Sequence, residues 1–226
     1  PMVDFDFAAK SYAKNGVAAA FDDIFTYTRA SSATFTNRRL KKNGGYEYFL
    51  DTDYVGNVTN LITYSEDFSN SDWSKSTTSV QSNVVDSPYN NFTADKLLLL
   101  STSGNILSTA TTSNESIASV YMKAGSDITS LQFRDGSGGV YSFFNLVGNN
   151  FTVGLSTANQ AYADYIKDGW WKLSIVVSSF TSGFRIALNG STGGFVYIWG
   201  AQLTESAKPL PYVKTLDVAV TKTFAE

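Results

Sequence analysis

Aromatic and acidic side chains in the second half of the chain are of the types that a sugar-binding surface uses. A sugar ring stacks its C–H face on an aromatic plane, and its hydroxyl groups bond to carboxylates and amides. The candidate planes are Tyr141, Tyr162, Tyr165 and Trp170, and the candidate hydroxyl partners are Asp135 and Asp168. Aromatic side chains also fill protein cores, so packing between sheets is the alternative interpretation of the same residues.

Other kinds of chemistry are limited by two residue types that the sequence lacks. The 226 residues include no His and no Cys. This removes the Ser-His-Asp triad, the cysteine nucleophile, disulfides, and metal sites built on thiolate or imidazole. Glycoside hydrolysis needs only two carboxyl groups and stays open as an alternative.

Metal and nucleic-acid sites are not indicated either. Asp127 and the turn Asp135-Gly136-Ser137 offer oxygen ligands for calcium, but no EF-hand pattern occurs and such residues favour ordinary tight turns. We expect no metal and no cofactor. The net charge is −3, and the one basic run, residues 38–42, leads into an Asn-Gly-Gly turn. We therefore expect a solvated turn, or a contact with an acidic subunit, and no nucleic-acid binding.

The sequence shows no sign of a targeting segment or a membrane span. Residues 1–7 lack a positive region followed by an apolar one, and no apolar run approaches the ~20 residues of a membrane helix. We expect synthesis in a cytoplasm and no membrane insertion.

Alternating apolar and polar residues predict the strands that must position the candidate residues. The predicted inward faces are Ala118, Val120 and Met122; Trp171, Leu173, Ile175 and Val177; and Phe184, Ile186 and Leu188. On the second of these strands, Trp170 and Lys172 are expected to point outward. Gly-rich segments at 125–127, 135–139 and 190–194 are predicted to end strands or close hairpins. The pattern predicts an all-β, antiparallel two-sheet jelly-roll sandwich.

Residues 1–58 differ from the rest of the chain. Thr and aromatic residues between 24 and 36 favour extended structure over helix. We expect an N-terminal arm or small β-subdomain whose apolar side chains dock on a partner. The candidate attachment residues are Phe5, Phe7, Phe21 and Phe25.

Four segments in a fixed order resemble a known family. They are Asn60–Lys75, Ser119–Gly125, Gly169–Ile175 and Val196–Glu205, with Tyr27–Phe35 as a fifth match upstream. Together they resemble the concanavalin-like, carbohydrate-binding-module-like jelly rolls of bacteriophage virion proteins, especially tail fibres. The resemblance covers roughly Asn60 to Thr215. It implies structural roles for Trp73 and Trp199, satisfaction of buried backbone groups by Gln202, and an exit strand at residues 209–213.

The resemblance implies a non-enzymatic virion structural protein, a capsid decoration or fibre, located in the virion. Residues 1–58 would attach it to capsid or tail subunits, residues 59–215 would form the displayed jelly roll, and residues 216–226 would form a tail. Expected partners are other virion subunits, further copies of the chain (a trimer is favoured), and a host-surface glycan. A free lectin module is the alternative. A glycan depolymerase is a further one, although the E-x-D-x-x-E strand pattern of jelly-roll glucanases is absent.

Overall fold

The computed structural model describes residues 56–224 and, nearer the N-terminus, the backbone of five short strands. The chain divides into two compact units, residues 1–36 and residues 37–226. In the first unit, β1 (Val3–Asp6), β2 (Ser11–Lys14) and β3 (Val17–Ala18) form an antiparallel sheet. In the second unit, β4 (Arg38–Leu40) pairs with β5 (Tyr46–Tyr48) before the larger sheets begin.

The candidate attachment residues belong to the first of these units. Phe7, Phe21 and Phe25 lie outside the described residues, and Phe5 lies on β1 opposite Tyr12. Their role in attachment stays a prediction.

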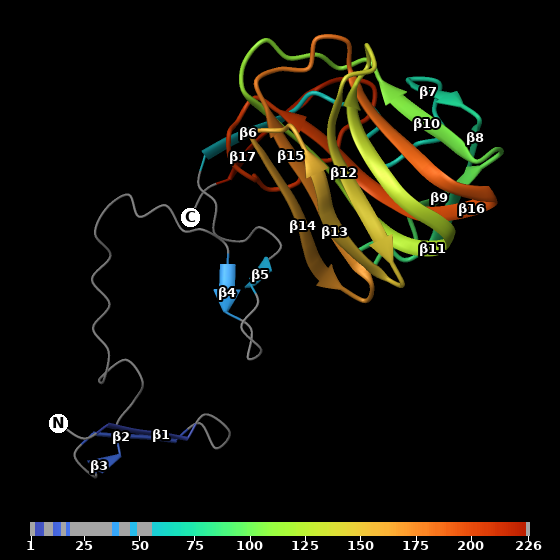
Figure 1. The fold of residues 1–226 in the computed structure, drawn as a ribbon. Helices are drawn as coiled ribbons and strands as arrows, with labels where there is room; N and C mark the ends of the chain where they lie inside the picture. The colour runs from blue at the N-terminus through green and yellow to red at the C-terminus, as the bar shows by residue number, and fades with distance from the viewer. Residues whose placement is uncertain are drawn as a thin grey trace. The chain divides into compact units, whose positions relative to one another are not determined.

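The strands from residue 56 onward pair antiparallel, which confirms the predicted all-β sandwich (Figure 1). The first of them, β6 (Gly56–Asn60), pairs with the last, β17 (Val220–Phe224). No helix in the described part of the chain is long and apolar enough to cross a membrane. The strands between β6 and β17 are β7 (Trp73–Ser76), β8 (Thr78–Val85), β9 (Ala94–Leu99), β10 (Ser103–Ser108), β11 (Ser116–Asp135), β12 (Val140–Val147), β13 (Asn150–Ser156), β14 (Gln160–Lys167), β15 (Trp170–Val177) and β16 (Phe184–Thr204).

Two long strands, β11 and β16, run through both layers of the sandwich (Figure 1). The second half of β11 and the first half of β16 lie in sheet A, with the order β13-β12-β11-β16-β10-β7. The first half of β11 and the second half of β16 lie in sheet B, with the order β14-β15-β11-β16-β9-β8. Register shifts in β11 between residues 124 and 130 mark the bend from one sheet to the other.

The bend corrects two predicted strand ends. Residues 125–127 and 190–194 were expected to end strands or close a hairpin, but β11 and β16 continue through them. The glycines instead allow the backbones of β11 and β16 to approach each other closely. A Cβ at Gly125 would lie 2.3 Å from the carbonyl oxygen of Phe195, and one at Gly190 would lie 2.1 Å from that of Asp127. Glycine is thus needed where the two long strands cross into the other sheet.

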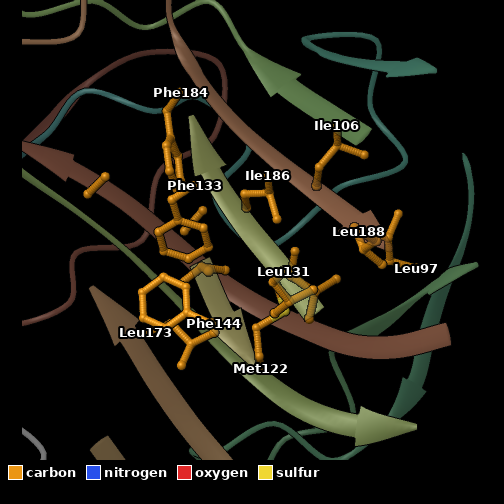
Figure 2. Packing of buried hydrophobic residues seen from close by; sticks show 14 of the residues in the cluster. Leu97, Ile106, Met122, Leu131, Phe133, Phe144, Leu173, Phe184, Ile186 and Leu188 are labelled. Carbon is orange, nitrogen blue, oxygen red and sulfur yellow. The ribbon is translucent and has the colours of Figure 1, made fainter. Parts of the chain in front are cut away.

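The core lies between the sheets and takes side chains from both (Figure 2). Sheet A contributes Phe133, whose ring centroid lies 4.8 Å from Phe144 and 5.1 Å from Phe184. The predicted inward residues Leu173 of β15 and Met122 of β11 face this cluster from sheet B and are fully buried. Each such side chain contributes roughly 1.5–3 kcal/mol by leaving water.

Trp170 and Lys172 lie on the outer face of sheet B, as predicted, but this face is also buried, so the two side chains do not face solvent. Trp170 is 2% exposed, and its Nε1 donates to the carbonyl of Asp86 at 3.1 Å. The Nζ of Lys172 donates to the carbonyl of Leu210 at 3.2 Å. The physical reason is a covering layer: the β8–β9 loop and the segment after β16 lie over these positions. Residues 209–213, predicted as an exit strand, form part of that cover without being a strand.

The side chain of Gln202 holds this cover in place. Its Nε2 donates to the carbonyl of Pro211 at 2.9 Å, and its Oε1 accepts the N–H of Val213 at 2.8 Å. The prediction that Gln202 satisfies buried backbone groups is therefore confirmed. Trp73 and Trp199, 1% and 2% exposed, are confirmed as packing residues.

Candidate functional site

A stack of aromatic rings lies on the outer face of sheet B. Tyr121 of β11 and Trp199 of β16 are almost fully buried there, with ring centroids 5.4 Å apart. Trp199 also contacts Tyr212 of the covering segment at 4.7 Å and Tyr89 of the β8–β9 loop at 5.0 Å. Unlike the other rings, Tyr89 keeps a large part of its surface in water, with 39% exposed. The stack thus presents one accessible aromatic ring on a rigid base.

A pocket of about 580 Å³ opens beside this ring. Its wall combines the aromatic stack with polar groups and with the C-terminal strand β17. The residues that line it are Glu66, Tyr89, Asn91, Trp199, Tyr212, Val213, Lys214, Val220, Thr221, Lys222 and Thr223. We call this the aromatic pocket.

Glu66 supplies the carboxylate of the aromatic pocket. Its Oε2 lies 2.7 Å from the Nζ of Lys214, and its Oε1 accepts the hydroxyl of Tyr212 at 3.2 Å. Burial raises the pKa of Tyr212 far above its ordinary value, and the Glu66 carboxylate raises it further. Tyr212 therefore stays neutral and keeps its proton for hydrogen bonding.

Asn91 supplies an amide to the aromatic pocket. Its Oδ1 accepts hydrogen bonds from the hydroxyls of Ser87 and Thr93. The Oγ1 of Thr93 in turn accepts the Nε1–H of Trp199 at 3.0 Å. This chain of hydrogen bonds fixes the loop to the aromatic stack and leaves the amide nitrogen of Asn91 without a partner among the described residues.

The aromatic pocket provides aromatic, carboxylate and amide groups that can bind a polar ligand. Among the described residues that line the aromatic pocket, Glu66 supplies the one carboxyl group, and Lys214 and Tyr212 already engage it. No cluster of three or more acidic residues that could hold a metal ion occurs among the described residues. Of the acidic residues considered as calcium ligands, Asp127 adopts a positive φ of 55° at the bend of β11, and Asp135 accepts hydrogen bonds from the N–H groups of Thr181 and Ser182.

The structure does not bring the sequence-predicted sugar residues together. Trp170 is buried under the cover of sheet B, as described above. Tyr141 packs on Phe180 with centroids 5.4 Å apart, and its hydroxyl donates to the carbonyl of Ser179 at 3.1 Å. Asp135 is buried in the β11–β12 turn. These three side chains serve packing and turn structure.

The other three predicted residues lie on β14 and the turn that follows it. Tyr162 is half-buried and its hydroxyl donates to the side chain of Gln160. Tyr165 is 37% exposed and contacts Trp171 at 5.4 Å. Asp168 is exposed, with φ of 50° in the hairpin turn before β15. These three residues are close to one another because they share one strand and its turn.

Sequence reasoning missed the residues of the aromatic pocket. Tyr89 follows Ser87-Pro88 and precedes Asn90-Asn91, a run of turn-forming residues around a single aromatic. An aromatic residue at the tip of a turn was the available signal. Glu66 and Tyr212 are 146 residues apart along the chain, so their contact could be found only from the fold.

Comparisons with known proteins find similarity to solved structures alone. No family model matches the sequence, and no curated protein matches it. Solved structures with similar folds include the enzymatically active domain of tailspike protein 4 of bacteriophage CBA120, at 16% identity and a TM-score of 0.37 over 64% of this chain. The chain spans 21% of that tailspike chain.

Two further similar structures contain xylan-binding or xylanase modules. The CBM22-1 xylan-binding domain of Paenibacillus barcinonensis Xyn10C has 16% identity and a TM-score of 0.40, over 68% of this chain and 98% of that one. The CBM22-1–GH10 modules of Clostridium thermocellum xylanase 10B have 11% identity and a TM-score of 0.40, over 71% and 30%. At this degree of likeness none of them assigns a function to this chain.

Proposed function

We propose that this protein is a non-catalytic glycan-binding β-sandwich that serves as a structural component of a bacteriophage virion. The observation that carries the binding role is the Tyr89 ring, 39% exposed and seated on Trp199, in a pocket that also holds Glu66 and Asn91. The ring stacks on the C–H face of a sugar, and the carboxylate and amide accept and donate hydrogen bonds to its hydroxyls. A volume of about 580 Å³ suits a short oligosaccharide.

The test of glycan binding compares two exposed tyrosines. The full chain is applied to a glycan array, and the best ligand is titrated against the wild type, Tyr89→Ala and Tyr165→Ala. Loss of the stacking ring in Tyr89→Ala is expected to weaken binding at least about tenfold, whereas Tyr165→Ala is expected to bind as the wild type does. Equal binding by all three proteins would remove the aromatic pocket from the proposal.

The absence of catalysis is part of the proposal and is tested with the same ligand. A binding module leaves the glycan intact in the presence of wild-type protein over hours. If the glycan is cleaved and Glu66→Gln abolishes cleavage, the protein is a depolymerase and the proposal fails.

The virion role rests on the sequence motifs that resemble phage virion jelly rolls, with residues 1–58 as the attachment segment. Its partners are other virion subunits and further copies of the chain, with a trimer favoured. Cryo-electron microscopy of the source particle is expected to find stoichiometric, symmetric copies with Phe5, Phe7 and Phe21 buried against a capsid or tail subunit. A protein that is absent from particles and binds glycans as a free monomer would instead be a lectin module.

A further inference from the structure

Two arginines lie side by side on the outer face of sheet A. Arg134 of β11 is the cross-strand partner of Arg185 of β16. Their neighbours Phe133 and Phe184 are fully buried in the core, so by strand alternation both arginines point away from it. Like charges at directly opposite positions destabilise a sheet. The pair therefore destabilises the sheet unless another group offsets the repulsion between the two positive charges.

Both guanidinium groups are held by one turn. The Nη2 of Arg134 donates to the carbonyl of Gly138 at 2.9 Å, and the Nη2 of Arg185 donates to the carbonyl of Gly136. These bonds draw the two cations to the same β11–β12 turn, and each arginine uses a single N–H group to reach it.

The turn itself is fixed to the sheet by Asp135. Its carboxylate accepts the N–H groups of Thr181 at 3.0 Å and Ser182 at 3.1 Å, and the N–H of Gly136 donates to the carbonyl of Gly183 at 2.9 Å. A Cβ at Gly136 would lie 1.7 Å from the carbonyl oxygen of Ser182, so the turn requires glycine there. Asp135, expected from the sequence to contact a sugar directly, is instead a positioning residue for the arginine pair.

Within residues 56–224, no acidic side chain forms an ion pair with either arginine. Among the described residues, the Nε atoms of both arginines are buried without a hydrogen-bond partner. The Asp135 carboxylate is occupied: burial raises its pKa, but hydrogen bonds from Ser137, Ser182 and Thr181 outweigh burial and hold the pKa below its ordinary value. The remaining guanidinium N–H groups thus form a preorganised cationic pair on an open sheet face.

The surroundings of the pair suit a saccharide better than a protein. Phe143 of β12 is half-buried opposite Gln132, on the same face as the arginines, and Asn145 is exposed beside it. A Cβ at Gly154 of β13 would lie 2.9 Å from the Nδ2 of Asn145 and 3.4 Å from the Cβ of Phe143, so glycine leaves room for the Asn145 amide there. A ring, amides and cations offer partners for sugar C–H, hydroxyl and oxyanion groups. A stable protein interface would need a larger apolar centre.

We propose that Arg134 and Arg185 form a second binding site, which takes the carboxylate or sulfate group of an acidic saccharide. The planar guanidinium groups match the geometry of an oxyanion, and its negative charge removes the repulsion within the pair. This site lies on sheet A and does not depend on the aromatic pocket, so the two proposals can fail separately.

The experiment is isothermal titration of the full chain at low and high salt. The probes are hexagalacturonate for carboxylate, a heparin hexasaccharide for sulfate, neutral xylohexaose and hexaglutamate. At least one acidic saccharide is expected to bind, with affinity reduced by salt, more tightly than xylohexaose or hexaglutamate. Arg134→Gln and Arg185→Gln should each weaken it at least tenfold, and Arg185→Lys several-fold because the planar fork is lost.

Lys208→Gln is the matched control, because it removes one positive charge from an exposed site elsewhere. It is expected to bind like the wild type, and near-ultraviolet circular dichroism establishes that each variant is folded. Binding that survives Arg134→Gln and Arg185→Gln overturns the proposal. So do equal losses in Lys208→Gln, equal binding of hexaglutamate, or the absence of acidic-saccharide binding by the wild type at low salt.

Discussion

The outer faces of the two sheets are built in opposite ways. On sheet B, Tyr121, Trp170 and Trp199 are at most 2% exposed because the β8–β9 loop and the segment after β16 cover them. On sheet A, Phe143 and Arg185 keep part of their surface in water. The covered face buries a second aromatic cluster beyond the core, and the open face leaves cations and amides in reach of solvent. Sheet B therefore stabilises the fold through both of its faces, whereas sheet A leaves its outer face available for binding.

The largest expected difference between the faces is in the free energy of unfolding after ring removal. Trp199→Ala empties a buried position in the aromatic cluster and is expected to destabilise the protein by roughly 3–5 kcal/mol. Phe143→Ala, the matched ring removal on sheet A, is expected to destabilise it by less than about 1 kcal/mol. Urea unfolding measures both. Similar losses for the two variants would contradict the division into a covered and an open face.

A matched pair of glutamines tests the cover itself. Gln202→Ala removes both hydrogen bonds to the covering segment and is expected to cost roughly 2–3 kcal/mol, because the carbonyl of Pro211 and the N–H of Val213 lose their partners. Gln132→Ala on the open face should stay within about 0.5 kcal/mol of the wild type. Tryptophan fluorescence and acrylamide quenching should report a more accessible Trp199 only in Gln202→Ala.

The sequence predicted the sandwich because strand periodicity is local. Leu173, Ile186 and Leu188 alternate as expected and are fully buried. Periodicity assigns one face of a strand to the core, but it is silent about what covers the other face. The burial of Trp170 is decided by the loop that carries Asp86, 84 residues away in the sequence.

The same limit applies to the candidate sites. Tyr89 and Tyr212 meet on Trp199 only because the chain returns over sheet B. Arg134 and Arg185 come into register only because β11 and β16 bend together from one sheet to the other. Gly125 and Gly190 indicated a change in chain direction. The sequence alone could not tell whether the strand ended in a turn or continued through a bend, because glycine is favoured in both. Residue types predicted glycan binding, which stays a proposal, and the positions of both candidate sites could be found only from the fold.

Each sheet holds one buried carboxyl group, Asp95 on sheet B and Asp135 on sheet A, and their pKa values are shifted in opposite directions. We therefore expect the two groups to change the free energy of unfolding in opposite directions as the pH rises. Burial raises the pKa of Asp95 to about 6, and the N–H groups of Asn83 and Phe68 offset this only in part. The folded state therefore holds this proton more tightly than the unfolded chain does. The free energy of unfolding contributed by Asp95 is greatest below pH 3.8 and falls as pH rises to about 6, by roughly 1–2 kcal/mol after solvent screening.

Asp135 on sheet A should act in the opposite direction. Its pKa is lowered in the fold, so its contribution to stability is present above the unfolded pKa and is lost as pH falls. Denaturant unfolding between pH 3 and pH 7 checks both groups. The free energy of unfolding of the wild type minus that of Asp95→Asn should decline with rising pH, and the wild type minus Asp135→Asn should decline with falling pH. Two differences of the same sign would show that hydrogen bonding does not outweigh burial at Asp135.

The smallest expected effect concerns Tyr165, at the edge where β14 leaves a ring exposed. Tyr165→Ala is expected to change stability by less than about 1 kcal/mol, because Trp171 keeps its contact with Phe151 and the bond from its Nε1 to the carbonyl of Asn149 at 3.2 Å. Fluorescence of Trp171 should still respond, since the two rings lie 5.4 Å apart. Glycan binding should not change. If it fell while Tyr89→Ala bound normally, the sugar site would lie on β14, where the sequence first placed it, and the cover on sheet B would be purely structural.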